Sequence, residues 1–171
     1  MAMPQQKPGR SKQDYSTPKD FIAAVKRRLG ITAFAHDFAA DRRNRKAETF
    51  FSRKDSAFDY SPEEWAVAAS GRDRSRWGWL NPTFNDITPW ANRASLCKDE
   101  GGQIAMLVPA SVGSNWFRDH VDGQARVLAL NGRHAFMPDQ PTWLYPKDCM
   151  LCLYSPAVKP GFEVWTWKDS L

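Results

Sequence analysis

The feature that most constrains the fold is a series of short apolar runs, separated by segments with helical spacing or polar turns. Several of these runs lack the polar alternation of a half-buried strand and span at most eight residues. Such runs are typical of strands buried on both faces of a parallel sheet. Because helical segments lie between them, they predict an α/β layered domain with a largely parallel sheet. The expected strands are 31–37, 47–52, 76–80, 103–110, 125–130 and 150–154, the last of the chain.

The first helix carries the clearest boundary signals. We expect Thr17 to cap it, Pro18 to occupy its first position and Asp20 to supply the acid of a capping box. Gly30 is expected to end it. Further helices are expected over 61–70, capped by Ser61, over 88–100 and over 114–121.

The length of the chain, 171 residues, suffices to bury one core without disulfides or metal ions. We expect a disordered basic tail over residues 1–13 and a single domain over residues 14–171. The initial "MAMPQQKPGRSKQ" lacks the apolar segment of a secretory signal, and no apolar run approaches the ~20 residues of a membrane span. These features predict a soluble, cytoplasmic protein with no membrane partner.

The charge of +5 is distributed unevenly along the chain. Residues 1–54 contain 13 basic and 5 acidic residues, a net of +8, and the remainder contains 11 basic and 14 acidic residues, a net of -3. A basic amino-terminal third suits a polyanionic partner such as nucleic acid. On charge alone, a solvated basic tail and helix face explain the pattern equally well.

The cysteines do not predict a metal site. Cys149 and Cys152 have C-x-x-C spacing but lie in an apolar run that is expected to be a strand. Residues three apart on a strand point to opposite faces, so these two thiols cannot share one ion. With Cys97 they make an odd count in a chain without an export signal, which favours reduced thiols.

Polar residues at strand ends indicate where a ligand binds. Asp37 and Asn81 each follow an expected strand, and open α/β sheets bind ligands at the carboxyl ends of their strands. The chain contains no G-x-S-x-G, G-x-x-x-x-G-K-[ST], H-E-x-x-H or G-x-G-x-x-G motif at the expected places. A ligand crevice beside Asp37 and Asn81 is therefore the leading site.

The segment "NPTF", residues 81–84, suits a flat ring that carries an exocyclic amine. The Asn81 side-chain oxygen and the Pro82 carbonyl can accept hydrogen bonds from the amine and localise its lone pair, because proline offers only its carbonyl there. Phe84 can stack on the ring. Taken alone, the tetrapeptide also fits a plain turn at a strand end.

"NPTF" after an apolar strand resembles the [DNS]-P-P-[YFW] motif of amino-methyltransferases. The order of several segments is similar to the phage-type DNA N6-adenine methyltransferase (Dam) family, and the resemblance covers roughly Asp14 to Pro156. The segments that carry it are "YSTP", "HDFAADRRNRKAETFF", "WLNPTFNDITPWANRA", "LVPASVGSNWF" and "LNGRHAF".

The resemblance implies a compact Rossmann-like, S-adenosylmethionine-dependent methyltransferase fold and methyl transfer to the N6 of an adenine flipped out of double-stranded DNA. It also implies roles for particular residues. The catalytic residues are Asn81, Pro82 and Phe84. The cofactor-binding residues are Thr17, Pro18, Asp37, Phe38 and Ala39. No metal is implied. A phage-encoded member acts in the host cytoplasm.

Two features separate this chain from the family pattern. Thr83 occupies the position of a second proline, which leaves the turn softer. The glycine-rich cofactor turn of larger methyltransferases is also missing, so Ala39 and Ala40 must provide the close approach to the cofactor. The resemblance does not assign the acid that holds the cofactor ribose, and Asp55 and Asp59 are guesses for it. The short chain leaves little room for a separate target-recognition domain, so recognition is expected to be loose or to rely on a homodimer.

Four arginines are candidates for DNA binding. Arg72, Arg74 and Arg76 share one face if their segment is extended, and Arg133 belongs to the family-like "GR" pair. For the first three, a charged sheet edge is an equally good explanation.

Three alternatives to adenine methylation stay open. The same tetrapeptide suits cytosine N4 or another planar amine. Thr83 and the basic amino-terminal third are also consistent with a catalytically degenerate DNA-binding member of the fold. A more remote alternative is a protein that uses the cofactor without DNA.

Overall fold

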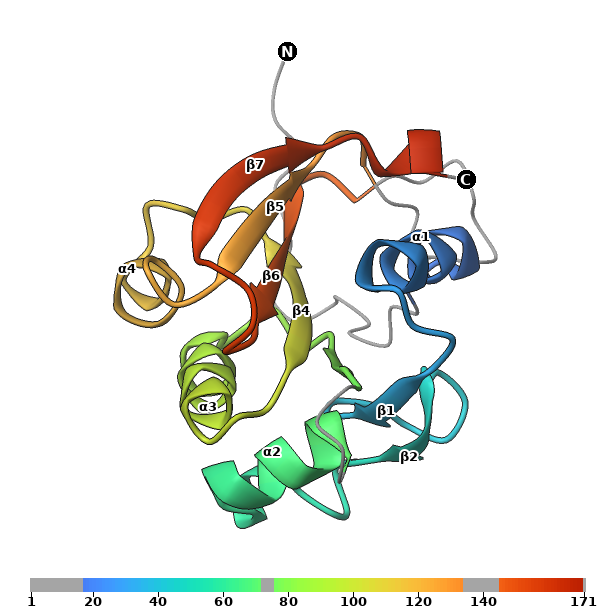
Figure 1. Ribbon diagram of the computed structural model, residues 1–171, viewed down its shortest axis with the longest axis vertical. Helices are drawn as coiled ribbons and strands as arrows, with labels where there is room; N and C mark the ends of the chain where they lie inside the picture. The colour runs from blue at the N-terminus through green and yellow to red at the C-terminus, as the bar shows by residue number, and fades with distance from the viewer. Residues whose placement is uncertain (1–16, 72–75, 134–144, 171) are drawn as a thin grey trace.

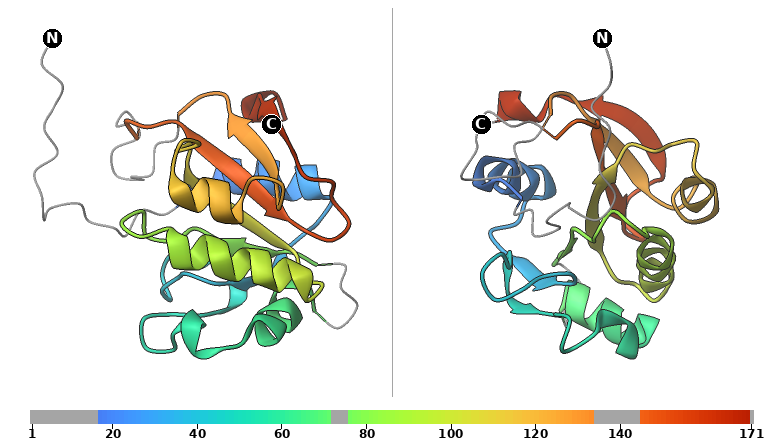
Figure 2. Two further views of the ribbon diagram at one scale, coloured as in Figure 1. Left: turned by 90° about the vertical axis from the view of Figure 1, so that its left-hand side faces the viewer. Right: turned by 180° about the vertical axis from the view of Figure 1, so that it is seen from behind.

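The structure is a computed structural model that describes residues 17–71, 76–133 and 145–170 (Figure 1). The tail expected over residues 1–13 lies outside them, as do Arg72 and Arg74. Within the described residues, one seven-stranded sheet has helices on both faces. Figure 2 shows α1 on one face, with α3 and α4 on the other.

The sheet confirms the α/β prediction with a mostly parallel order, β2-β1-β3-β4-β6-β5-β7. All neighbouring strands are parallel except the two pairs made by β6, which is antiparallel to β4 and β5. The strands are β1 (Phe34–Asp37), β2 (Ala47–Phe50), β3 (Gly78–Leu80), β4 (Ile104–Pro109), β5 (Arg126–Leu130), β6 (Cys149–Tyr154) and β7 (Gly161–Trp165). The predicted Rossmann-like arrangement is consistent with this sheet.

The prediction that the last strand is 150–154 is wrong, because β7 follows it and forms an edge of the sheet. β7 has no continuous apolar run. Its Phe162 and Val164 are exposed, and its Glu163 accepts a 3.0 Å bond from Arg126. Only Trp165 at its end is buried. An edge strand with one exposed face lacks the sequence signal that identified the central strands.

Two hydrophobic clusters lie on the two faces of the sheet. One contains buried residues of α2 and α3 and the other those of α1 and the carboxyl-terminal segment. Cys152 belongs to the first cluster and Cys149 to the second, which confirms that they point to opposite faces. The helices are α1 (Lys19–Leu29), α2 (Pro62–Ser70), α3 (Thr88–Asp99) and α4 (Asn115–His120), with 3-10 turns η1 (Ala57–Asp59) and η2 (Trp167–Ser170).

The predicted amino-terminal cap of α1 is wrong. The helix begins at Lys19, Pro18 occupies the cap position and no side chain caps it. The Asp20 carboxylate accepts from the adjacent Phe21 N–H instead. Thr17 points its hydroxyl toward Asn81, which gives it a role at the crevice. At the other end, Gly30 ends the helix with φ 67°, as expected.

Helix α2 has the cap that was expected. The Ser61 hydroxyl accepts from the Glu64 N–H, and the Glu64 carboxylate accepts from the Ser61 N–H, forming a capping box. The helix packs behind β1 and β3, where Gly78 leaves no room for a side chain. A Cβ there would lie 2.6 Å from the Phe38 ring and 3.2 Å from Ala69 of α2. This close packing fixes β3 against the helix and so fixes the position of the residues that follow it.

The described residues can also be compared with the requirements of a membrane-spanning helix and of a metal site. No helix among them is both long and apolar enough to cross a membrane. Residues 17–71, 76–133 and 145–170 also contain no group of three or more His, Cys, Asp or Glu side chains suited to a metal ion.

Candidate active site

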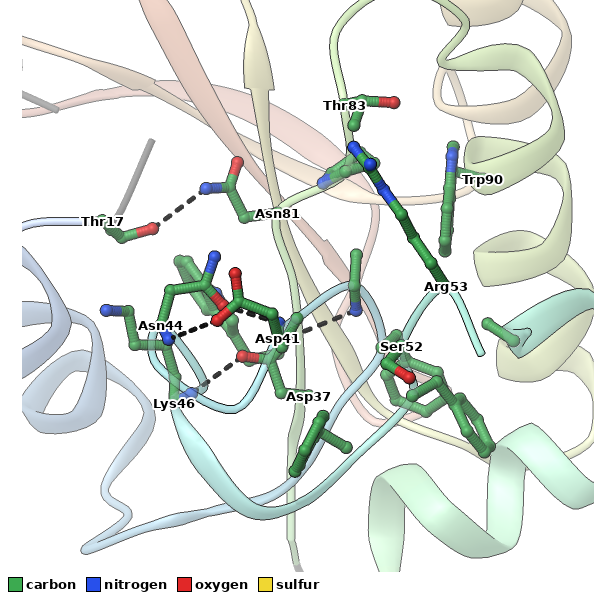
Figure 3. Close-up of a pocket in the computed structure, with 18 of the residues that line it drawn as sticks. Thr17, Asp37, Asp41, Asn44, Lys46, Ser52, Arg53, Asn81, Thr83 and Trp90 are labelled. Carbon is green, nitrogen blue, oxygen red and sulfur yellow. Dashed lines mark hydrogen bonds between the residues drawn. The ribbon is translucent and has the colours of Figure 1, made fainter. Parts of the chain in front are cut away.

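A cavity of about 970 Å³ opens at the carboxyl ends of β1, β2 and β3 (Figure 3). It brings together residues that are far apart in the sequence, from Thr17 to the segment 145–147. Seven of the eight residues predicted to bind the cofactor or act in catalysis line it. They are Thr17, Asp37, Phe38, Ala39, Asn81, Pro82 and Phe84. The eighth, Pro18, occupies the cap position of α1 beside Thr17 and is not among the described residues that line the cavity.

Asn81 is held by one specific bond. Its Nδ2 donates to the Thr17 Oγ1 over 3.1 Å, and Thr17 is only 3% exposed (Figure 3). The Asn81 Oδ1 is shielded from solvent and has no hydrogen-bond partner among the described residues. A shielded acceptor without a partner is costly and rare in folded proteins, so this oxygen is suited to a donor from a ligand.

The residues after Asn81 complete one wall of the cavity. Pro82 is buried, whereas Thr83 is exposed at the cavity mouth. The Phe84 ring is half-buried and meets the Tyr145 ring edge-on, with centroids 5.6 Å apart. Tyr145 lines the cavity too and was not predicted, because it follows a stretch without periodic spacing.

Asp37 organises the loop between β1 and β2. Its carboxylate accepts from the Ala39 N–H over 3.3 Å and from the Lys46 N–H over 2.8 Å, joining the two ends of the loop. Burial raises the pKa of Asp37 to about 6, against the lowering effect of these two backbone bonds. The side chain thus shapes the cavity wall and can also face a ligand.

Phe38 and the residues around it form the floor. Phe38 is 1% exposed and packs on Trp65, with ring centroids 4.3 Å apart, and on Phe51. His36 lies edge-on to both Phe38 and Phe51. This aromatic packing makes the floor rigid and apolar.

The model of the DNA N-6-adenine-methyltransferase (Dam) family matches residues 5–154. This chain belongs to the Dam family. It is 26% identical over 119 residues to a DNA N-6-adenine-methyltransferase of Escherichia phage T1, an alignment that covers 67% of this chain and 43% of that relative. The chain thus aligns with less than half the length of the phage protein. The predicted family is confirmed.

Other residues that line the cavity were not predicted from the sequence motifs. The cavity also has a polar lining from the β1–β2 loop and from the segment after β2, and an aromatic one from Trp90 and Phe58, whose rings are 4.5 Å apart. A polar turn directly after the strand 47–52 was a signal that could have located this part. The polar lining residues include Asp41, Asn44, Lys46, Ser52, Arg53, Lys54 and Ser56.

The guesses for a ribose-binding acid do not reach the cavity. Neither Asp55 nor Asp59 is among the described residues that line it, and the Asp55 carboxylate accepts from the Tyr60 hydroxyl over 2.9 Å. The acids that do line it are Asp37 and Asp41. Trp116 and Phe117 pack against the core and are not among the described residues that line the cavity.

The two predicted DNA-binding arginines that the structure describes lie apart from the cavity. Arg76 is exposed at the amino end of β3, the opposite end from Asn81, and lines a second cavity. Arg133 is exposed after β5 and lies 3.5 Å from the Asp148 carboxylate. Their role in DNA binding stays a prediction.

Proposed function

We propose that this Dam family member is an S-adenosylmethionine-dependent DNA methyltransferase that acts on the N6 of adenine. The observation that carries the proposal is the shielded Asn81 Oδ1, an acceptor without a partner among the described residues. It lies beside Pro82 and Phe84 in a cavity large enough for a cofactor and a base. The family match and the name of the phage T1 relative point to the same reaction.

Asn81 and Pro82 would activate the substrate amine by accepting its hydrogens. The lone pair of the adenine N6 is delocalised into the ring, which makes the amine a poor nucleophile. Two acceptors on its hydrogens localise that pair and aim it at the methyl donor, which lowers the barrier through orientation and preorganised dipoles. Pro82 has no N–H, so it can offer only its carbonyl.

No general base is needed in this reaction. An amine that has gained a methyl group becomes acidic and loses its proton to water. The neutral amide of Asn81 is therefore sufficient, provided that its oxygen faces the amine. The bond from its Nδ2 to Thr17 fixes that orientation, since it commits the nitrogen to the opposite side.

The cavity residues are suited to the cofactor. S-adenosylmethionine, when bound, supplies a methyl group on a sulfonium centre. We propose that Thr17 and Pro18 lie against its methionine part and that Asp37, Phe38 and Ala39 line its pocket. The buried Thr17 hydroxyl, the Asp37 carboxylate and the small Ala39 side chain fit a ligand with amino, carboxylate and hydroxyl groups.

The acceptor would be an adenine flipped out of duplex DNA, because a base inside the stack cannot enter a cavity of this kind. Phe84 would stack on the base, and Tyr145 would support Phe84 from the side. A substrate of this kind implies action in the cytoplasm where the DNA resides, the host cytoplasm for a phage-encoded enzyme. We also propose that the protein acts as a homodimer, which would let it recognise a longer DNA site.

The test is to incubate the protein with methyl-labelled S-adenosylmethionine and unmethylated DNA, and to identify the modified nucleoside by mass spectrometry. We expect label in N6-methyladenine. Label in N4-methylcytosine would show that cytosine, not adenine, is the substrate. Label in protein alone would overturn the proposal of a DNA methyltransferase. Salt-dependent DNA binding without any incorporation would indicate a degenerate member of the fold.

A further inference from the structure

The loop between β1 and β2 carries a concentration of basic residues that the proposed chemistry does not use. Its segment 41–46, "DRRNRK", has four basic residues and one acid. Two hydrogen bonds to the Asp41 carboxylate, from the Arg43 and Asn44 N–H groups, hold it as a tight turn. The Asp41 N–H donates to the Asn44 Oδ1 in return. The turn is therefore ordered by its own polar atoms, which leaves the arginine side chains exposed.

This loop lies between two cavities. Arg42 and Lys46 line the large cavity, and Arg45 and Lys46 line a second cavity of about 480 Å³ at the amino ends of β1 and β2. Arg76 lines the second cavity from the start of β3, with Glu48 as the acid in its lining. Lys46 lines both cavities and so links the basic residues of the two linings.

The arginines of the loop are available to a partner. Arg42, Arg43 and Arg45 form no ion pair with a described residue. The Arg45 guanidinium lies over the Phe50 ring and donates to the Glu48 carbonyl over 2.8 Å. These contacts hold the group in place but leave its charge uncompensated, which lowers the entropy lost when it binds an anion.

The methyl donor does not account for this charge. S-adenosylmethionine carries a sulfonium and an ammonium group against one carboxylate, so it is a net cation. Figure 3 shows Asn44 and Lys46 on one side of the large cavity and Arg53 on the other. The basic residues that line it are Arg42, Lys46, Arg53, Lys54 and Lys147, against the acids Asp37 and Asp41. A net positive rim fits a polyanion better than a cation.

We propose that a basic track, consisting of Arg42, Arg43, Arg45, Lys46 and Arg76, binds the phosphate backbone of the DNA that presents its base to the large cavity. The track extends from the large cavity past the amino end of β2, an edge strand, to Arg76 just before β3. Phosphate contacts of this kind position a duplex without reading its sequence. The proposal rests on the proposed function for its choice of DNA as the polyanion.

The experiment compares two double variants with the same change in charge. Arg43→Gln/Arg45→Gln removes two charges of the track that do not line the large cavity. Arg27→Gln/Lys159→Gln removes two exposed charges that line neither cavity. Binding to a short DNA duplex is measured by fluorescence anisotropy over a series of salt concentrations. Affinity for S-adenosylhomocysteine is measured by calorimetry for each protein.

We expect the slope of log affinity against log salt to become shallower by about 1.8 in the track variant, and the affinity to fall roughly tenfold at physiological salt. The control should retain the wild-type slope, and both variants should bind S-adenosylhomocysteine normally. An equal loss of DNA affinity in the two variants would overturn the proposal of a basic track. So would a wild type without salt-dependent binding, or a loss confined to S-adenosylhomocysteine.

The binding readout separates this proposal from the proposed function. If wild type transfers no methyl group but the contrast between the double variants holds, the enzymatic proposal fails and the track stands. If wild type methylates adenine and the contrast is missing, the track alone fails.

Discussion

Replacement of Thr17 by valine tests how the Asn81 amide is oriented. The substitution keeps the shape of a side chain that is 3% exposed and removes the oxygen that accepts the 3.1 Å bond from the Asn81 Nδ2. An N–H that loses its acceptor away from solvent costs about 1–3 kcal/mol, and the Asn81 amide is partly buried. The amide can avoid that cost only by leaving the orientation in which Oδ1 faces the substrate. At saturating cofactor and DNA, we therefore expect the rate of methyl transfer to fall about 5- to 150-fold.

The assay is single-turnover transfer of labelled methyl to DNA, with the affinity for S-adenosylhomocysteine measured in parallel. Thr17→Ser is the matched control, because serine keeps the hydroxyl and should recover most of the rate. A Thr17→Val protein with the wild-type rate at saturation, whose only defect is weaker S-adenosylhomocysteine binding, would refute the reasoning. That result would make Thr17 a cofactor contact and nothing more.

Three further predictions concern the cavity. Burial lowers the pKa of His36 to about 4, so between about pH 4 and 6.5 the unfolded chain binds more protons than the folded one, and the stability falls as the pH falls through that range. His36→Phe should remove about 2 kcal/mol of the stability lost between pH 7.5 and 5, as measured by urea denaturation. Equal losses of stability in wild type and variant would contradict this. Asp37→Asn deprives the Ala39 or the Lys46 N–H of its acceptor. The affinity for S-adenosylhomocysteine, measured by calorimetry, should fall about tenfold. An unchanged affinity would show that the loop does not depend on the carboxylate. Phe84→Ala should lose about 1–3 kcal/mol of base stacking. With 2-aminopurine in place of the target adenine, the fluorescence increase on binding should be weaker in the variant. An unaltered increase would show that Phe84 does not belong to the base pocket.

The central strands could be predicted because their burial leaves a direct mark on the sequence. β3 and β4 are buried at every position, so their apolar runs are continuous, and the polar residue after β3 indicates the ligand edge of the sheet. The same logic placed Asp37 and Asn81 at one crevice, where both line the large cavity. Parallel strands bring their carboxyl ends to one edge of the sheet, so this prediction does not depend on the conformation of the loops.

The features that were not predicted from the sequence depend on contacts between residues far apart in the chain. Thr17 has all the local signals of a helix cap, yet it bonds to Asn81, sixty-four positions away. Tyr145 meets Phe84, which lies sixty-one positions earlier in the sequence. β7 is an edge strand with exposed Phe162 and Val164, so its pattern differs from that of the buried strands. None of these contacts leaves a periodic signal in the local sequence.

The measurement that tests the central claim most directly is the rate of methyl transfer to adenine N6 in DNA by Asn81→Ala and by Asn85→Ala. Both residues line the cavity, but only Asn81 has the shielded oxygen that we assign to the substrate amine. We predict that Asn81→Ala slows transfer by about 10²–10³-fold, as expected for the loss of one preorganised polarising group, while Asn85→Ala stays near the wild-type rate. Equal rates for wild type and Asn81→Ala, with DNA binding intact in both, would contradict the account.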